Sequence, residues 1–276
     1  MEALDPAARA FDAIAPTFDA RFGPWRSVAA QRGAVRASLL RAFPVGARVL
    51  EIGGGTGEDA LWLAGQGREV MMTDASPAMV EIARRKLAGR TAHSPRVAAA
   101  QSLGQLADAL LAEQCAPFDG AFSNFAALNC VSDLALTAKG LARLVRPGGR
   151  AVLVVFGTLC VGEVVVQLLR REPRAAFRRR SRADVTARLS GREFVVRYHR
   201  RGDIERAMHP WFGLMATKGI GVFVPPSAAE PWISARPSLL RGLEMADRLV
   251  SSALAPLGDH VLHEFRRTNV PATELS

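Results

Sequence analysis

The chain has 276 residues, of which 49% are hydrophobic and 22% charged. This length suits one α/β domain with an insertion or two small domains, and the composition excludes a chain that is disordered throughout. The formal net charge is +10, and arginine supplies 33 of the 36 basic residues, so nucleic acid, anionic lipid and acidic substrates are the partners that charge favours.

The cysteines and the N-terminal residues indicate the cellular compartment in which the protein is expected. Cys115, Cys130 and Cys160 are odd in number and lack metal-site spacing, which is typical of a reducing environment. The first residues, MEALDPAARAF, contain no apolar segment of the kind found in secretory signals. We therefore expect a cytoplasmic protein.

The first 45 residues are expected to be helical. Pro16 and the pair Gly23-Pro24 interrupt the pattern, and residues 27–43 form an amphipathic helix that ends before Pro44.

A glycine-rich turn follows the first predicted strand. Val49–Ile52 is a short apolar run carrying one acid, Glu51, and a helical pattern begins at Glu58. The glycines between them allow a tight turn and a close approach of the backbone to a ligand; they are Gly53, Gly54, Gly55 and Gly57. The dinucleotide spacing G-x-G-x-x-G is not met, because position 58 is glutamate.

A second acid ends the second predicted strand, Glu69–Asp74. Asp74 comes 23 residues after Glu51, as in a Rossmann-like βαβ unit, where such a carboxylate accepts both ribose hydroxyls. Ser76 and Pro77 then form a helix start.

Three further stretches complete the predicted core. Residues 96–106 contain the third strand and its exit, and residues 118–131 contain the fourth strand and the loop beyond it. A helix ends near Val145, a Pro-Gly-Gly turn follows at residues 147–149, and the fifth strand is Ala151–Phe156.

Four of these stretches, in this order, resemble the motifs of class I S-adenosylmethionine (SAM) methyltransferases. They are the acid with G-x-G-x-G from Glu51, Asp74-x-Ser-x-x-Met79, the fourth strand with its tip, and V-x-P-G-G at 145–149, where the family usually has leucine first. The resemblance implies an α/β, Rossmann-like seven-stranded SAM methyltransferase fold with an N-terminal helical cap and a helical and strand insertion. It also implies SAM as the cofactor.

The resemblance assigns thirteen residues to the cofactor. Met79 is expected to lie against the adenine, and Phe18 replaces the usual tyrosine that closes over SAM. Gln101 and Ser102 stand where the family often has an acid near the adenine amino group. The full set is Phe18, Glu51, Gly53, Gly54, Gly55, Gly57, Asp74, Ala75, Met79, Gln101, Ser102, Asn124 and Phe125.

Beyond residue 157 the sequence is less informative. The apolar run Ala151–Leu169 has about the length of a membrane span, but Glu163 and two glycines favour a strand followed by a partly buried helix. Residues 170–182 contain seven arginines and one aromatic residue, which favours a solvated helix face and loop over a nucleic-acid site. A peripheral contact with an anionic membrane stays open.

The distal elements are expected to add a strand at 193–199, a helix at 201–208, the sixth strand at 212–224, a helix at 238–254 and the last strand at 258–266. The division is then a cap at 1–45, a SAM-binding core at 46–160, a substrate-side insertion at 161–257 and the last strand with the tail at 258–276. In this family the last strand is antiparallel, so its start faces the ligand crevice. His260 is therefore our candidate general base, and a structural Gly-Asp-His turn is its alternative.

We expect direct displacement of the SAM methyl group by an acceptor, with alignment of the two reactants as the main contribution of the enzyme. Trp211, Phe223, Trp232 and Met245 suggest a hydrophobic small molecule, although core packing explains them equally well. An RNA methyltransferase that uses residues 170–182 and a non-catalytic scaffold are the alternatives. The sequence predicts no metal site and leaves the oligomeric state open.

Overall fold

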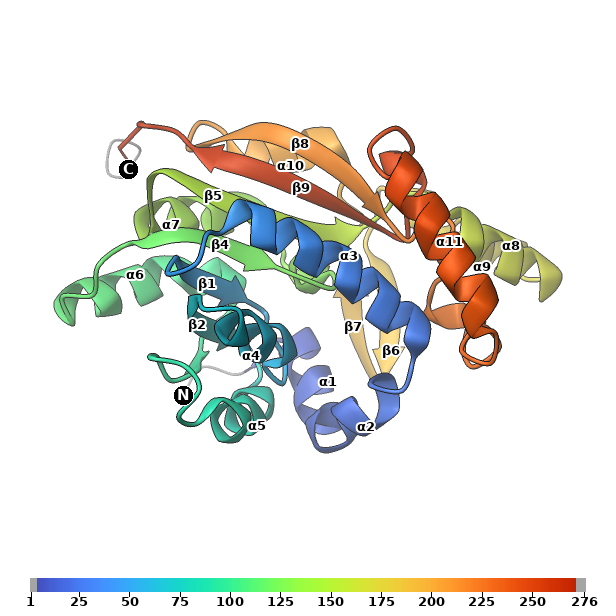
Figure 1. Cartoon of the computed structure of the whole chain (residues 1–276), viewed down its shortest axis with the longest axis horizontal. Helices are drawn as coiled ribbons and strands as arrows, with labels where there is room; N and C mark the ends of the chain where they lie inside the picture. The colour runs from blue at the N-terminus through green and yellow to red at the C-terminus, as the bar shows by residue number, and fades with distance from the viewer. Residues whose placement is uncertain (1–3, 272–276) are drawn as a thin grey trace.

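A single seven-stranded sheet organises the computed structural model, which describes residues 4–271 (Figure 1). The strand order is β3-β2-β1-β4-β5-β9-β8. The strands are β1 (Arg48–Ile52), β2 (Glu69–Asp74), β3 (Arg96–Val97), β4 (Phe118–Ser123), β5 (Val145–Phe156), β8 (Phe212–Ile220) and β9 (His260–Arg267). β1 to β5 are parallel, and β9 runs antiparallel to both β5 and β8, which confirms the expected fold class.

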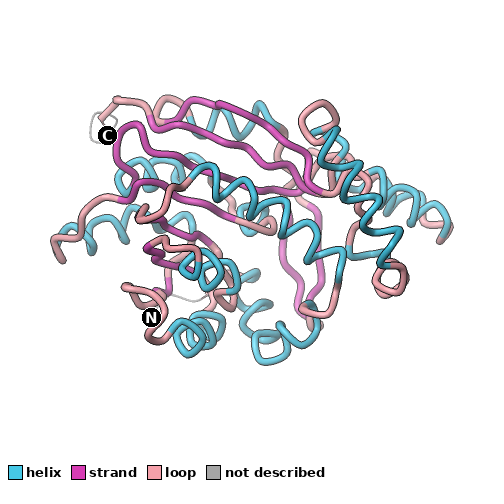
Figure 2. Tube along the Cα trace, viewed as in Figure 1, coloured by secondary structure: helices cyan, strands magenta, loops and turns pink. Residues whose placement is uncertain are grey.

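Helices cover both faces of this sheet (Figure 2). α3 (Arg26–Ala42), α4 (Glu58–Gly65) and α5 (Pro77–Leu87) pack on the face that carries Val49, and α6 (Leu103–Ala112), α7 (Leu134–Leu144) and α10 (Arg201–Met208) pack on the face that carries Leu50. Successive strand residues point to opposite faces, so strands covered on both sides read as continuous apolar runs. That is why the core strands were recognisable in the sequence.

The N-terminal helices pack on a small separate sheet. Asp5 caps the start of α1 (Pro6–Ile14), where its side chain accepts a hydrogen bond from the Ala8 amide at 2.9 Å, and a 3-10 turn leads into α2 (Phe18–Phe22). α1 lies on the hairpin of β6 (Val185–Leu189) and β7 (Arg192–Val196), where the rings of Phe11 and Phe194 are 5.8 Å apart. α3 follows these helices in the chain but belongs to the core layer.

Three further helices gather at one end of the molecule (Figure 1). They are α8 (Val161–Leu169), α9 (Pro173–Ala176) and α11 (Pro237–Val250). Within residues 4–271 no helix is both long and apolar enough to cross a bilayer. The apolar run 151–169 divides into the end of β5 and α8, as expected.

Two expected elements are shorter than predicted. β8 ends at Ile220 rather than at Val224, because Gly221 adopts φ +68° and the amides of Phe223 and Val224 bond to the Asp247 carboxylate. The third strand has only two residues and gives way to a 3-10 turn at Ala100–Ser102.

One expectation for the arginine-rich segment was wrong. Arg179 is not on a solvated face but is 7% exposed, and it forms ion pairs with the buried acids Glu163 and Asp259. The other arginines of residues 170–182 are exposed, as expected.

Candidate functional site

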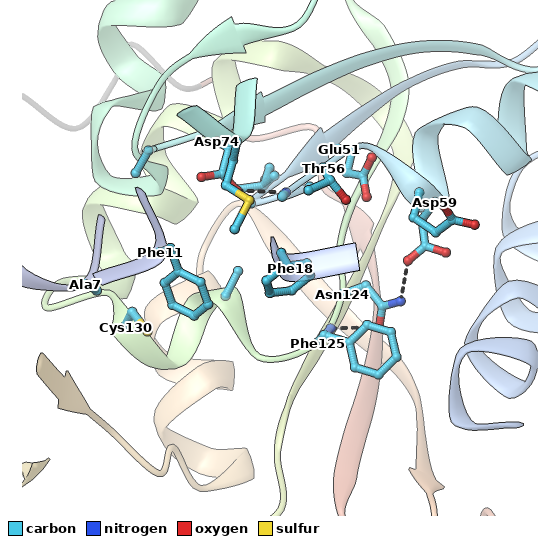
Figure 3. Close-up of a pocket in the computed structure, with 18 of the residues that line it drawn as sticks. Ala7, Phe11, Phe18, Glu51, Thr56, Asp59, Asp74, Asn124, Phe125 and Cys130 are labelled. Atoms are coloured by element: carbon cyan, nitrogen blue, oxygen red, sulfur yellow. Dashed lines mark hydrogen bonds between the residues drawn. The ribbon is translucent and has the colours of Figure 1, made fainter. Parts of the chain in front are cut away.

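A cavity of about 470 Å³ opens at the carboxyl ends of the parallel strands (Figure 3). This is within the usual size range of small-molecule sites, roughly 300–1,000 Å³. Every residue that lines it lies between Asp5 and Val131. Figure 3 shows Asp74 on one side and Glu51 with Asp59 on the other, while the rings of Phe11 and Phe18 reach in from the N-terminal helices.

The glycine loop after β1 forms the floor of this cavity and requires its glycines. Gly53 and Gly55 have φ of +67° and +57°. A Cβ on Gly53 would lie 2.4 Å from the Ala127 Cβ, and one on Gly54 would lie 2.6 Å from the Met72 Cγ. Side chains at Gly53 and Gly54 would therefore collide with their neighbours, and the loop can follow this path only with glycine. Gly57 does not line the cavity; it precedes α4 in a left-handed conformation and faces Ala83.

Asp74, at the end of β2, holds this loop in place. Its Oδ2 accepts a hydrogen bond from the Gly55 amide and its Oδ1 accepts one from the Ser76 amide, both at 2.8 Å. Burial raises the pKa of Asp74 although these backbone bonds favour its charged form. Ala75 and Met79 line the cavity beside it.

Glu51 is a buried acid without a hydrogen-bond partner for one of its oxygens. It is 2% exposed, and no described residue bonds to its Oε2. Burial and the nearby Asp59 raise the pKa of Glu51 well above its ordinary value, and Arg32 opposes them. Because an unsatisfied buried carboxylate is costly, this oxygen marks a place for a donor supplied by a ligand.

Asp59 is a site residue that the sequence interpretation missed. It lies in the first turn of α4, accepts a hydrogen bond from Asn124 Nδ2 at 2.8 Å and pairs with Arg36 Nε at the same distance. Arg32 Nη1 is 3.8 Å away. Arg32 and Arg36 are four residues apart in an amphipathic helix, so their common face was readable, but their partner on α4 was not.

The tip of β4 is strained. Phe125 and Ala126 have φ of +47° and +61°, which non-glycine residues rarely adopt. The Asn124 side chain supports the turn, since its Oδ1 accepts a hydrogen bond from the Phe125 amide at 2.8 Å. Strain of this kind collects at functional sites, and here one of the two strained residues, Phe125, lines the cavity.

Two aspartates tie the N-terminal helices over the cavity. Asp12 Oδ1 accepts hydrogen bonds from Ser76 Oγ and from the Ala78 amide, both at 2.8 Å. Asp19 bonds to Thr56 Oγ1 at 2.6 Å and to Lys86 Nζ at 2.8 Å.

His260, the candidate base, does not line the cavity. Its Nδ1 is 3.1 Å from Gln31 Oε1 and 3.5 Å from Asp259, and its ring stacks on Phe156 and meets the edge of Phe125. Burial lowers the pKa of His260, with Asp259 opposing that shift. Phe125 therefore stands between this imidazole and the cavity.

Of the remaining predicted cofactor residues, all but Ser102 line the cavity. Those in the lining are Phe18, Gln101, Asn124 and Phe125. Trp211 is a core residue, and Phe223, Trp232 and Met245 are exposed, so none of these four lines the cavity.

Comparisons with known proteins agree with this geometry. Residues 49–149 match a family model described as a methyltransferase domain. A ubiquinone biosynthesis O-methyltransferase from Xylella fastidiosa is 37% identical over 133 residues, which cover 45% of this chain and 51% of that protein. The chain thus spans about half the length of the curated relatives it matches.

Solved structures share the fold. A SAM-dependent methyltransferase from Mesorhizobium loti is 20% identical with a TM-score of 0.52, over 86% of this chain and 98% of the other. A structure described as a DhpI–SAH complex is 17% identical with a TM-score of 0.53, over 98% and 100% of the two chains. The [4+2]-cyclase SpnF is 17% identical with a TM-score of 0.58, over 97% and 98%. At these identities the likeness concerns the fold alone.

Proposed function

We propose that this chain is a class I SAM-dependent methyltransferase that transfers a methyl group to a hydrophobic small-molecule acceptor. The match of residues 49–149 to a methyltransferase domain supports this proposal. The observation that carries the proposal is the buried Glu51 Oε2, which has no hydrogen-bond partner among the described residues, beside a loop that can be built only from glycine. A ligand with an ammonium group would supply the donor that Glu51 lacks, and a flat part of the same ligand could pack directly against the backbone of the glycine loop.

The residues of the cavity divide into groups that suit the parts of SAM. Glu51 would accept a hydrogen bond from the ammonium group of SAM. Arg32, which interacts electrostatically with Glu51, would balance the negative charge of the SAM carboxylate. The second lone pairs of Asp74 would accept from the ribose hydroxyls, with Met79 and Gln101 beside the adenine. Acidic side chains outnumber basic ones in the cavity lining, which favours the binding of a positively charged ligand.

SAM supplies a methyl group activated by a sulfonium centre, which an acceptor oxygen, nitrogen or carbon displaces in line. The contribution of the chain is to align the reactants and to exclude water. Such alignment alone can lower the activation free energy by several kcal/mol, up to roughly 7–11. The N-terminal helices, held by Asp12 and Asp19, provide that exclusion.

The acceptor side is proposed to be the aromatic wall. Phe18, Phe22 and Trp25 form a continuous cluster with ring centroids 4.8 and 5.0 Å apart, and all three line the cavity. The named activity of the Xylella relative, O-methylation in ubiquinone biosynthesis, supports a hydrophobic acceptor of small size. We retain His260 as the proposed base for an acceptor that needs deprotonation, which requires the Phe125 ring to swing aside.

Calorimetry with SAM tests the cofactor assignment. We expect Asp74→Ala to weaken binding by at least tenfold, because charged hydrogen bonds contribute about 1.5–3 kcal/mol. The exposed Asp108→Ala is the control, and unchanged affinity in Asp74→Ala would remove the ribose assignment.

The reaction itself needs a direct assay, because the fold is shared with a protein described as a cyclase. A screen of phenols, quinols, amines and lipids with labelled SAM should transfer label to at least one acceptor. SAM binding without transfer to any acceptor would favour the scaffold alternative, and transfer to RNA would favour the RNA methyltransferase.

A further inference from the structure

The helix α8 has its polar side inward and its apolar side outward. Glu163 and Gln167 are buried, whereas Val161, Val165, Leu168 and Leu169 are exposed. The exposed residues follow the spacing i, i+4, i+7, i+8 of a helix face. Leu169 is 80% exposed. A helix in water normally shows the reverse arrangement, so this face requires an apolar neighbour.

A second helix at the same end of the molecule also exposes apolar side chains (Figure 1). α11 has one fully buried residue, Leu240, and leaves Leu239, Met245 and Leu249 exposed. Leu249 is 84% exposed. The loop between β8 and α11 links the two helices, because Arg170 at the end of α8 donates a hydrogen bond to the Ala228 carbonyl at 3.0 Å.

The apolar residues are accompanied by arginines. Residues 170–182 and 236–248 contain nine exposed arginines, and Glu172 is the one exposed acid in these two segments. We call α8, residues 170–182 and residues 232–250 the basic apolar face. Its charge and its apolar helices together match a surface that is anionic outside and apolar beneath.

We infer that the basic apolar face is a docking surface for an anionic lipid bilayer. The apolar side chains of α8 and α11 would enter the interface, and the arginines would contact the headgroups. A second copy of the chain fits less well, since a two-fold contact would bring the same arginines together. Nucleic acid would leave the apolar helix faces without a partner.

Ser234 of the face and Glu230 just before it join this end of the molecule to the rim of the cavity. Glu230 Oε1 accepts hydrogen bonds from the Ser27 amide at 3.0 Å and from Ser27 Oγ at 2.6 Å, and Ser234 Oγ accepts one from the Arg26 amide. The neighbouring residues Trp25, Val28 and Ala29 line the cavity. If the proposed methyl transfer holds, a membrane-dissolved acceptor would have a short path to it.

Vesicle co-sedimentation of the full chain tests the inference without any activity measurement. The probes are pure phosphatidylcholine vesicles and vesicles of equal parts phosphatidylcholine and phosphatidylglycerol. We expect binding to the anionic vesicles only, weakened by salt. We expect Leu169→Glu, Leu249→Glu and Arg174→Glu each to reduce the partition coefficient by at least about fivefold.

Matched variants at the other end of the molecule separate docking from general charge effects. Leu111→Glu removes a leucine of α6 that is 72% exposed, and Arg90→Glu removes an exposed arginine after α5; both variants should bind vesicles like the wild type. Equal losses in all five variants, or no binding to either vesicle, would overturn the inference. So would a dimer in sedimentation that the three face variants dissociate, or RNA retention through Arg174 without lipid binding. We expect all five variants to bind SAM like the wild type. A negative vesicle result would therefore overturn the docking surface but not the proposed function.

Discussion

At the scale of single residues, the site keeps unfavourable features that a purely structural protein would have little reason to keep. Glu51 is buried with an unpartnered oxygen beside a second acid, and the tip of β4 places two non-glycine residues at positive φ. Each feature costs stability, and both face the same cavity. Their coincidence is the strongest residue-level argument that the cavity binds a ligand.

Glu51→Gln should therefore have opposite effects on stability and on binding. Removing a buried charge is expected to stabilise the protein without ligand by on the order of 1 kcal/mol at neutral pH, which is about 2–4 °C in Tm. SAM affinity should fall by at least tenfold, because the ammonium group loses a charged acceptor. Differential scanning calorimetry and isothermal titration check the two effects, and a loss of both stability and affinity would mean that Glu51 is structural.

The raised pKa of Glu51 also predicts how binding depends on pH. An ammonium ligand prefers the ionised carboxylate, so affinity should decline as pH falls through the raised pKa, at values above the ordinary carboxyl range. In Glu51→Gln this decline should be absent. Titrations with SAM over a pH series in both proteins provide the comparison.

At the scale of elements, the N-terminal helices act as a tethered cover for the cavity. Asp12 connects α1 to the start of α5, and Asp19 connects α2 to the glycine loop and to Lys86. Both anchors reach segments that surround the proposed SAM site. The position of the cover and the integrity of the site are thus coupled.

We expect Asp12→Ala to weaken SAM binding by about tenfold, since it removes an acceptor shared by two donors. The effect should lie mainly in faster dissociation, as is usual when a contact around a bound ligand is lost. Stopped-flow displacement measures it. Asp133→Ala is the matched control, because it removes the N-cap of α7 away from the cavity and should lower stability but not affinity.

At the scale of the whole molecule, a buried charge cluster fixes α8 and the residues after α9 to the start of β9. Arg179 donates to the Asp259 carbonyl and carboxylate at 2.7 Å and pairs with Glu163, while Gln31 of α3 donates to Asp259 Oδ2 at 3.1 Å. Burial raises the pKa of Asp259, but His260 and Arg179 outweigh it, so that pKa is lowered. The cluster thus joins residues from four separate parts of the chain.

Arg179→Met should destabilise the protein by about 3–5 kcal/mol, because it leaves two buried carboxylates without their main partner. Asp259, whose pKa is depressed, stabilises the wild type above its unfolded-state pKa, and this contribution disappears as pH falls through the folded-state pKa. The difference between the two proteins should therefore be largest near neutral pH and shrink in acid. Urea unfolding at several pH values tests this, with the exposed Arg174→Met expected within about 0.5 kcal/mol of the wild type.

The sequence by itself determined the order of the core elements up to β5 and the glycine loop with its two acids, whereas it missed β6 of the small hairpin. Strand and helix periodicity, turn glycines and helix caps act between residues that are close along the chain, so they can be read without a structure. The helix at 201–208 and the amphipathic helix near 27–43 appear where these rules place them.

Only the tertiary structure decided which charges meet and which faces stay open. Asp59 pairs with Arg36 of another helix, Arg179 meets Asp259 80 positions away, and α8 turns Glu163 inward because that arginine is there. Composition suggested that residues 170–182 were solvated, which is wrong for Arg179. The distal aromatic residues suggested either a hydrophobic acceptor or core packing, but Phe223 and Trp232 are exposed and do not line the cavity. The burial of a charge depends on partners brought together by folding, and periodicity along one segment carries no information about those partners.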